Sequence, residues 1–199
     1  MALNEFAFPK ILTDLDLKMV DGDLVSAIPP VDVSPDFRKL LTSGVQLAVA
    51  INTEKARSEF VISLVLLELK QLLGSKVNVF SGTALDGDAS RGLSGICDFI
   101  LARSTSQLVL GAPIVTIIEA KNFDLVSGYA QCISAMMAAK LLNEREGRTV
   151  SAIYGASTTG SEWRFLRLID STITADNVVV PISQIDRILG ILSQFALSD

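Results

Sequence analysis

The stretch Ile114-Val115-Thr116-Ile117-Ile118-Glu119-Ala120-Lys121 decides the fold class of this chain. Its run of β-branched residues predicts a buried strand over residues 114–121. Side chains in a strand alternate between its two faces, so Glu119 and Lys121 point the same way and Ala120 points the other way. The sequence therefore places a carboxylate and an ammonium group on one face, at the end of an apolar strand.

A second acidic strand is predicted upstream, over residues 96–102, and it carries Asp98. If this strand pairs with residues 114–121, the side chains of Asp98 and Glu119 can lie about 5 Å apart. Two carboxylates that close repel each other, and an oxygen-seeking divalent cation such as Mg²⁺ relieves the repulsion. A lysine beside such a cation can orient or deprotonate a water molecule.

The acid-x-lysine pattern alone is weak, because Asp16-Leu17-Lys18 and Glu68-Leu69-Lys70 also match it. Glu68 and Lys70 fall in a predicted helix, where residues two apart do not share a face. Asp16 has no earlier strand that supplies an acidic partner. For Glu119 and Lys121 the alternative interpretation is a surface salt bridge near the end of a strand.

Two further polar residues count against that alternative. Glu59 lies beside Phe60 in a largely apolar helix, where a carboxylate is costly unless it is paired or bound to a metal. Gln131 lies in a later apolar helix, where its amide needs a partner. Each also has an ordinary interpretation: Glu59 can face solvent with Ser63, and Gln131 can lie at a helix edge.

The predicted element order defines an α/β protein with a central mixed β-sheet flanked by helices. Thr53 and Gly74 are the expected caps of a long helix. We expect residues 53–199 to form one compact domain and residues 1–52, with a short helix over 35–41, to form a peripheral or capping segment. The elements predicted within the domain are helix 54–73, strands 77–80, 96–102 and 114–121, helix 126–144, strands 149–154 and 163–169, and helix 182–195.

The amino-acid composition excludes several kinds of catalytic and binding site. The 199 residues include no histidine, which excludes histidine-based triads, zinc sites and general bases. The net charge of −5 argues against bulk electrostatic coating of nucleic acid but permits a local basic site. Cys97 and Cys132 are expected to be free thiols in a reducing, cytoplasmic environment. Neither a membrane span nor a secretory signal is predicted.

Together these residues and this order of elements resemble the PD-(D/E)XK nuclease superfamily, over roughly residues 54–169. Asp98 matches the family's aspartate, and Glu119-Ala120-Lys121 matches its (D/E)-x-K motif. Glu59 and Gln131 match residues that some branches carry, with Glu54 as an alternative to Glu59. Cys97 stands in place of the proline that gives the family its name. The resemblance implies a restriction-endonuclease-like core.

It also implies a metal-dependent nuclease that hydrolyses phosphodiester bonds, with DNA preferred to RNA. Asp98, Glu119 and the carbonyl of Ala120 would bind Mg²⁺, for which Mn²⁺ can substitute. Lys121 would position or activate the attacking water, Glu59 would add an outer carboxylate, and Gln131 would hold the lysine or the substrate. The alternative function is a non-catalytic regulatory or interaction protein that retains the fold. The sequence indicates no particular oligomeric state.

Overall fold

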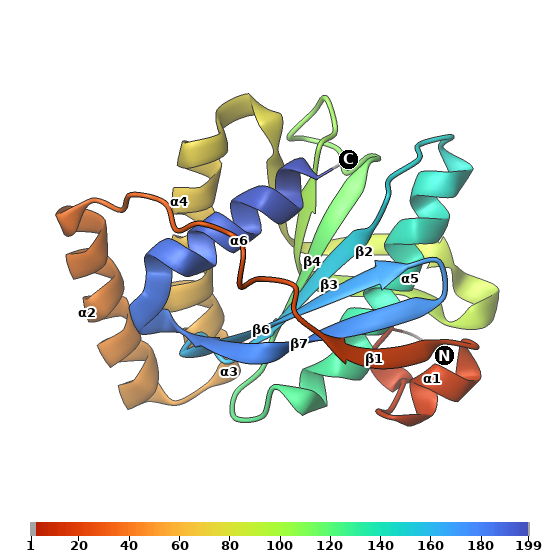
Figure 1. The fold of residues 1–199 in the computed structure, drawn as a ribbon, viewed down its shortest axis with the longest axis horizontal. Helices are drawn as coiled ribbons and strands as arrows, with labels where there is room; N and C mark the ends of the chain where they lie inside the picture. The colour runs from red at the N-terminus through yellow and green to blue at the C-terminus, as the bar shows by residue number, and fades with distance from the viewer. Residues whose placement is uncertain (1–2, 199) are drawn as a thin grey trace.

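A computed structural model describes residues 3–198 as a seven-stranded mixed sheet with helices on both faces (Figure 1). The strands lie in the order β1-β7-β6-β5-β4-β3-β2. This arrangement confirms the predicted α/β class and the central mixed sheet flanked by helices. The strands are β1 (Lys18–Gly22), β2 (Asn78–Asp88), β3 (Leu93–Ala102), β4 (Ile114–Ala120), β5 (Ile153–Thr158), β6 (Glu162–Ile169) and β7 (Thr172–Pro181).

The helices fall into two layers. In Figure 1, α2, α4 and α6 lie on one side of the sheet, and α1 and α5 lie on the other. The helices are α1 (Lys10–Asp14), α2 (Pro35–Ile51), α3 (Glu54–Arg57), the π-helical η2 (Ser58–Ile62), α4 (Ser63–Leu73), α5 (Tyr129–Arg145) and α6 (Ile185–Leu197), with single 3₁₀ turns η1 (Leu3–Glu5), η3 (Gly74–Lys76), η4 (Ala89–Arg91), η5 (Val126–Gly128) and η6 (Ile182–Gln184).

Strand β4 lies in the interior of the sheet, between β3 and β5. It runs antiparallel to β3 and parallel to β5, and all seven of its residues are buried. The parallel pairing requires a crossover, which α5 supplies on one face of the sheet. Ile117 packs into the core on the α5 side, and Ile118 packs into the core beneath α4 and α6. The neighbour relation predicted for strands 96–102 and 114–121 is confirmed.

The long helix predicted over residues 54–73 is also confirmed, with one irregularity. Its first turn is capped by Thr53, whose hydroxyl accepts a hydrogen bond from the Ala56 amide at 3.1 Å, and its last turn ends at Gly74. Between α3 and α4 the chain forms the π-helical segment η2. The helix expected over residues 35–41 begins as predicted, with Ser34 as its cap, but continues to Ile51.

Several strands differ from the sequence prediction. Residues 82–95, expected to form a loop, belong mostly to a β2–β3 hairpin in which Thr83 pairs with Cys97 and Asp86 with Ser94. β5 begins four residues later than the predicted strand over 149–154, and β1 and β7 were not predicted. Residues 82–95 are rich in glycine, aspartate and serine, which are depleted in strands. β1 is short and pairs with the distant β7, whereas β7 itself is rich in β-branched residues and pairs with β6 across a two-residue turn.

Residues 3–52 take part in the main fold. β1 forms one edge of the sheet by parallel pairing with β7. Leu3 and Ile11 are buried in the same core as α5. The boundary proposed at residue 52 stays a prediction, but this N-terminal segment contributes both a strand and core side chains.

The two cysteines are free and buried, as expected. Cys97 packs with Cys132 in the core on the α5 side, whereas simple alternation was expected to turn Cys97 away from the acidic face. The alternation in β3 is interrupted near Asp98, since Phe99 lies in the core on the opposite side. The pairing register places Gly82 of β2 across from Asp98, and Gly82 has a left-handed φ of 60°.

Both thiols should therefore be unreactive in the native protein. Burial, together with the nearby charges of Glu119 and Asp98, raises the pKa of Cys97 to about 12, and burial also raises the pKa of Cys132. Because the thiolate is the reactive form, iodoacetamide at about pH 8 should label neither residue in the native protein and both in strong denaturant. Peptide mass spectrometry would check this; native labelling of Cys132 would contradict its position in the core.

Candidate active site

The end of β4 brings two acidic residues together across neighbouring strands. Phe99 of β3 pairs with Ile118 of β4, and Asp98 and Glu119, the next residues along these strands, lie close enough for the charge of Asp98 to raise the pKa of Glu119. One oxygen of Asp98, Oδ2, accepts a hydrogen bond from the backbone amide of Ala120 at 2.8 Å. The side chain of Asp98 is thus tied to the strand that carries Glu119.

Glu119 is buried, with 1% of its surface exposed. Its Oε1 accepts a hydrogen bond from Lys121 Nζ at 2.8 Å. The same ammonium group donates to Gln131 Oε1 at 3.2 Å, from the first turn of α5. We call Asp98, Glu119, Lys121 and Gln131 the carboxylate–lysine group. The structure therefore brings together four of the five side chains that the sequence singled out.

The second oxygen of Glu119, Oε2, is buried and has no hydrogen-bond partner. A carboxylate oxygen left in this state is costly, because it has lost its hydration without replacement. Burial and, next, the charge of Asp98 raise the pKa of Glu119 to about 8, although Lys121 offsets part of their effect. Without a cation, Glu119 therefore keeps its proton near neutral pH, and a bound cation would favour its ionised form.

Lys121 is held as a cation. Burial on its own lowers the pKa of this lysine, but the negative charges of Glu119, Glu54 and Asp98 outweigh that effect, so its pKa is raised. In this arrangement the ammonium group is a donor and a positive charge, not a free base. It can orient a water molecule or stabilise negative charge on an oxygen.

The structure places Glu59 outside the carboxylate–lysine group. Its side chain is 51% exposed and pairs with Lys55 at 3.1 Å, one helical turn away. Glu54, in the first turn of α3, is instead the helix carboxylate whose charge acts on Lys121. Residues five apart on a helix differ in direction by about 140°, so these two glutamates do not share a face.

Sequence reasoning missed Arg57, which fixes the backbone next to Lys121. Arg57 is 9% exposed, and its guanidinium donates to Asn122 Oδ1 at 3.0 Å and to the Thr159 carbonyl at 3.0 Å. The amide of Lys121 itself donates to the Thr158 carbonyl at 2.8 Å. An arginine on the apolar face of a long helix is the signal that could have drawn attention to it.

Gly128, at the start of α5, was also missed. A Cβ at this position would lie 2.3 Å from Ser157 Oγ and 3.0 Å from Lys121 Cγ. The close approach of the α5 N-terminus to β5 thus leaves room for the lysine side chain only because residue 128 has no side chain.

The residues present fit a divalent cation of the Mg²⁺ type. Asp98 and Glu119 offer hard oxygen donors, and the unpaired Oε2 of Glu119 has no protein donor to satisfy it. Among residues 3–198, no three or more His, Cys, Asp or Glu side chains are grouped to hold a metal. An ion here would depend on two carboxylates, a main-chain carbonyl such as that of Ala120, and water, which is the mixed ligand set that Mg²⁺ commonly takes.

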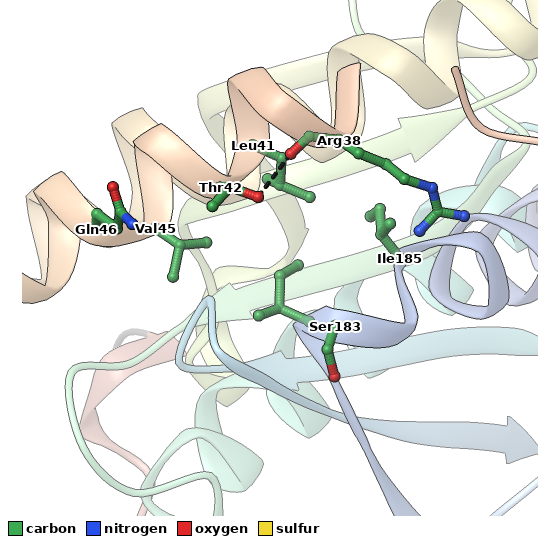
Figure 2. Close-up of a pocket in the computed structure, with 8 residues that line it drawn as sticks. Arg38, Leu41, Thr42, Val45, Gln46, Ser183 and Ile185 are labelled. Carbon is green, nitrogen blue, oxygen red and sulfur yellow. Dashed lines mark hydrogen bonds between the residues drawn. The ribbon is translucent and has the colours of Figure 1, made fainter. Parts of the chain in front are cut away.

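A pocket of about 390 Å³ lies elsewhere, between α2 and the segment around η6 (Figure 2). Its walls are mainly apolar, with Leu41, Val45 and Ile185 facing one another and Arg38 reaching along one end. None of the residues that line it belongs to the carboxylate–lysine group.

Comparison with known proteins does not assign this chain to a family. The chain has no significant match to a known family model, to a curated protein or to a solved structure. None of the helices formed by residues 3–198 combines the length and apolar character needed to span a lipid bilayer.

Replacing Gly128 by alanine should destabilise the fold by about 1–3 kcal/mol, because the added methyl group overlaps Ser157 Oγ and displaces the stem of Lys121. Gly111→Ala is the matched control, since its new Cβ would meet only ordinary contact at 3.7 Å from Ser104. Urea unfolding of both variants would measure the difference. Equal stability of the two variants would show that α5 can move away from β5 at little cost.

Glu119 should make stability depend on pH. Between its ordinary pKa of 4.5 and its raised value of about 8, the folded protein retains a proton that the unfolded chain has lost. This contribution to the free energy of unfolding is therefore fully present below pH 4.5 and is lost as pH rises toward 8. The chain has no histidine, so no histidine titrates in this window.

Urea unfolding in EDTA, repeated from about pH 5 to about pH 8, would measure this fall in stability. Glu119→Gln cannot ionise, so its stability should vary much less over the same range. A parallel pH dependence in wild type and Glu119→Gln would mean that Glu119 is ionised in the folded protein throughout the range.

Proposed function

We propose that this protein is a metal-dependent nuclease that hydrolyses phosphodiester bonds, with DNA as the preferred substrate. The observation that carries the proposal is the buried Glu119, close to Asp98 and bonded to Lys121, with one carboxylate oxygen left without a partner. A purely structural ion pair would be expected to satisfy both oxygens. This oxygen can share the proton that Glu119 retains with Asp98 or can bind a cation, and we assign it the second role.

The arrangement of elements supports a restriction-endonuclease-like core and membership of the PD-(D/E)XK superfamily. The chain runs from the helix 54–73 through the antiparallel β2, β3 and β4, then through α5 to β5, which lies parallel to β4. The acidic residues occupy the second and third of these strands, and the lysine follows directly. This is the order and placement that the resemblance implies.

Asp98, Glu119 and the Ala120 carbonyl would hold Mg²⁺ or Mn²⁺. Such an ion supplies Lewis acidity and charge neutralisation at a phosphate. Lys121, held by Glu119 and Gln131, would orient the attacking water and stabilise negative charge as it develops. Glu54 takes the outer carboxylate role proposed for Glu59, since its charge acts on Lys121 while Glu59 pairs with Lys55 at the surface.

Lys121→Met should keep the fold, because it retains much of the aliphatic stem, but should reduce cleavage by about a hundredfold or more. Asp98→Asn should weaken metal binding and cleavage together, since it removes a negative ligand. Purified protein would be assayed with Mg²⁺ or Mn²⁺ on single-stranded, duplex and branched DNA and on RNA. Isothermal titration with Mn²⁺ would report metal binding separately.

Glu54→Gln and Glu59→Gln form a matched pair within one helix. The first should reduce cleavage, and the second should leave it near the wild-type rate. If the wild-type protein cuts none of the four substrates, or if Lys121→Met cuts as well as wild type, the nuclease proposal is wrong. The non-catalytic interaction protein, which the net charge of −5 favours, would then take its place.

A further inference from the structure

An exposed aromatic residue follows the carboxylate–lysine group closely in the sequence. Phe123 follows Lys121 by two residues, in the segment that joins β4 to η5, and 73% of its surface is exposed. In Figure 1 this segment is the green loop at the lower edge of the view, close to α3. Burying a phenylalanine stabilises a fold by about 1.5–3 kcal/mol, so its exposure here forgoes a contribution that most such residues make.

The chain before Phe123 is fixed. Asn122 accepts a hydrogen bond from Arg57 Nε at 3.0 Å and donates to the Asn52 carbonyl at 3.4 Å. These bonds attach the loop to α3 and to the end of α2. Arg57 is itself anchored to the Thr159 carbonyl at 3.0 Å, so the loop is tied to the β5–β6 turn as well.

The chain after Phe123 is fixed too. Asp124 turns its carboxylate back onto the loop and accepts hydrogen bonds from the amides of Val126 and Ser127, at 3.0 and 3.2 Å. The carbonyl of Leu125 accepts from Ser157 Oγ at 2.7 Å. With both flanks bonded, the backbone that carries the exposed ring is held in place. A rigid aromatic group loses little conformational entropy when a ligand binds to it.

The position of Phe123 in the chain indicates which kind of ligand it could contact. The Cα atoms of Lys121 and Phe123 are at most about 7 Å apart, given the reach of two residues. A nucleic-acid strand bound at the carboxylate–lysine group therefore brings a base within reach of the ring. In segment 122–128 the large apolar side chains exposed by more than a third are Phe123 and Val126, which are too few for a protein interface of about 800 Å² per partner.

We propose that Phe123 is a stacking platform for a nucleobase next to the scissile phosphate. The face of an unpaired base is free to stack on an aromatic ring, whereas a base inside a duplex is covered on both faces by its neighbours. The site therefore prefers single-stranded DNA or unpaired nucleotides at a junction or end. This inference rests on the proposed nuclease function and names the substrate class of that site.

Fluorescence can test the stacking without any cleavage. Trp163 is the only tryptophan in the chain and is fully buried, so Phe123→Trp adds a second indole at the surface. In EDTA, a single-stranded oligodeoxythymidylate should quench the added fluorescence, and a strand of the same length made of abasic nucleotides should quench it little. A blunt duplex should also quench it weakly. Equal quenching by the base-bearing and abasic strands would overturn the proposal.

Binding of the single strand should weaken about tenfold or more in Phe123→Ala and should be retained in Phe123→Tyr, which keeps the aromatic face. Val126→Ala is the matched control, because it removes another exposed apolar side chain of the same segment. Fluorescence anisotropy with a labelled strand in EDTA would measure all four proteins. Unchanged affinity in Phe123→Ala would contradict stacking.

The outcomes separate the two proposals. If the protein binds single strands through Phe123 but Lys121→Met cleaves as fast as wild type, the catalytic assignment fails and the stacking platform stands. If wild type cleaves in a Lys121-dependent way while Phe123→Ala binds and cleaves unchanged, the platform is wrong and the nuclease stands. If the wild-type protein neither binds nor cleaves any nucleic acid, both are wrong.

Discussion

The rest of the site depends on one physical constraint, the burial of the Glu119 carboxylate at the end of an interior strand. β4 is buried throughout, with Thr116 as its one other polar residue, so the carboxyl group of Glu119 enters a region without water to solvate it. Lys121 satisfies one oxygen and leaves the other unpaired. The remaining polar contacts, from Asp98 to the Ala120 amide and from Lys121 to Gln131, are arranged around this one buried group.

Much of the fold could be predicted from local signals. The apolar run of β4, the capping hydroxyl of Thr53 and the terminal Gly74 each act within a few residues of the structure they specify, and each was interpreted correctly. β1 has no such signal, and its residues become a strand by pairing with β7, which lies far away in the sequence. β7 and the β2–β3 hairpin pair with strands next to them in the sequence, and the β-branched residues of β7 are a local signal that was missed.

The residues of the candidate site also fall into those that the sequence could predict and those that it could not. Asp98, Glu119 and Lys121 could be placed together because strand alternation and antiparallel register are simple geometry. The choice between Glu54 and Glu59 could not be made, because it depends on how the helix is rotated against the sheet. Arg57 and Gly128 were missed because their importance comes from contacts with Asn122 and Ser157, which no spacing in the sequence reveals.

The parallel pairing of β4 with β5 has a consequence for the order of folding. It joins Thr116 to Tyr154, and the intervening chain includes the whole of α5. Contacts between residues so far apart in sequence close a large loop and form slowly compared with a hairpin. The β2–β3–β4 meander can therefore form first and bring Asp98 close to Glu119. The bonds of Lys121 to Thr158 and to Gln131 form only after β5 and α5 have packed against the meander. A newly made chain would thus bring Asp98 and Glu119 together early and would form the contacts of Lys121 last. A partly folded molecule would therefore have the acidic pair without the positioned lysine.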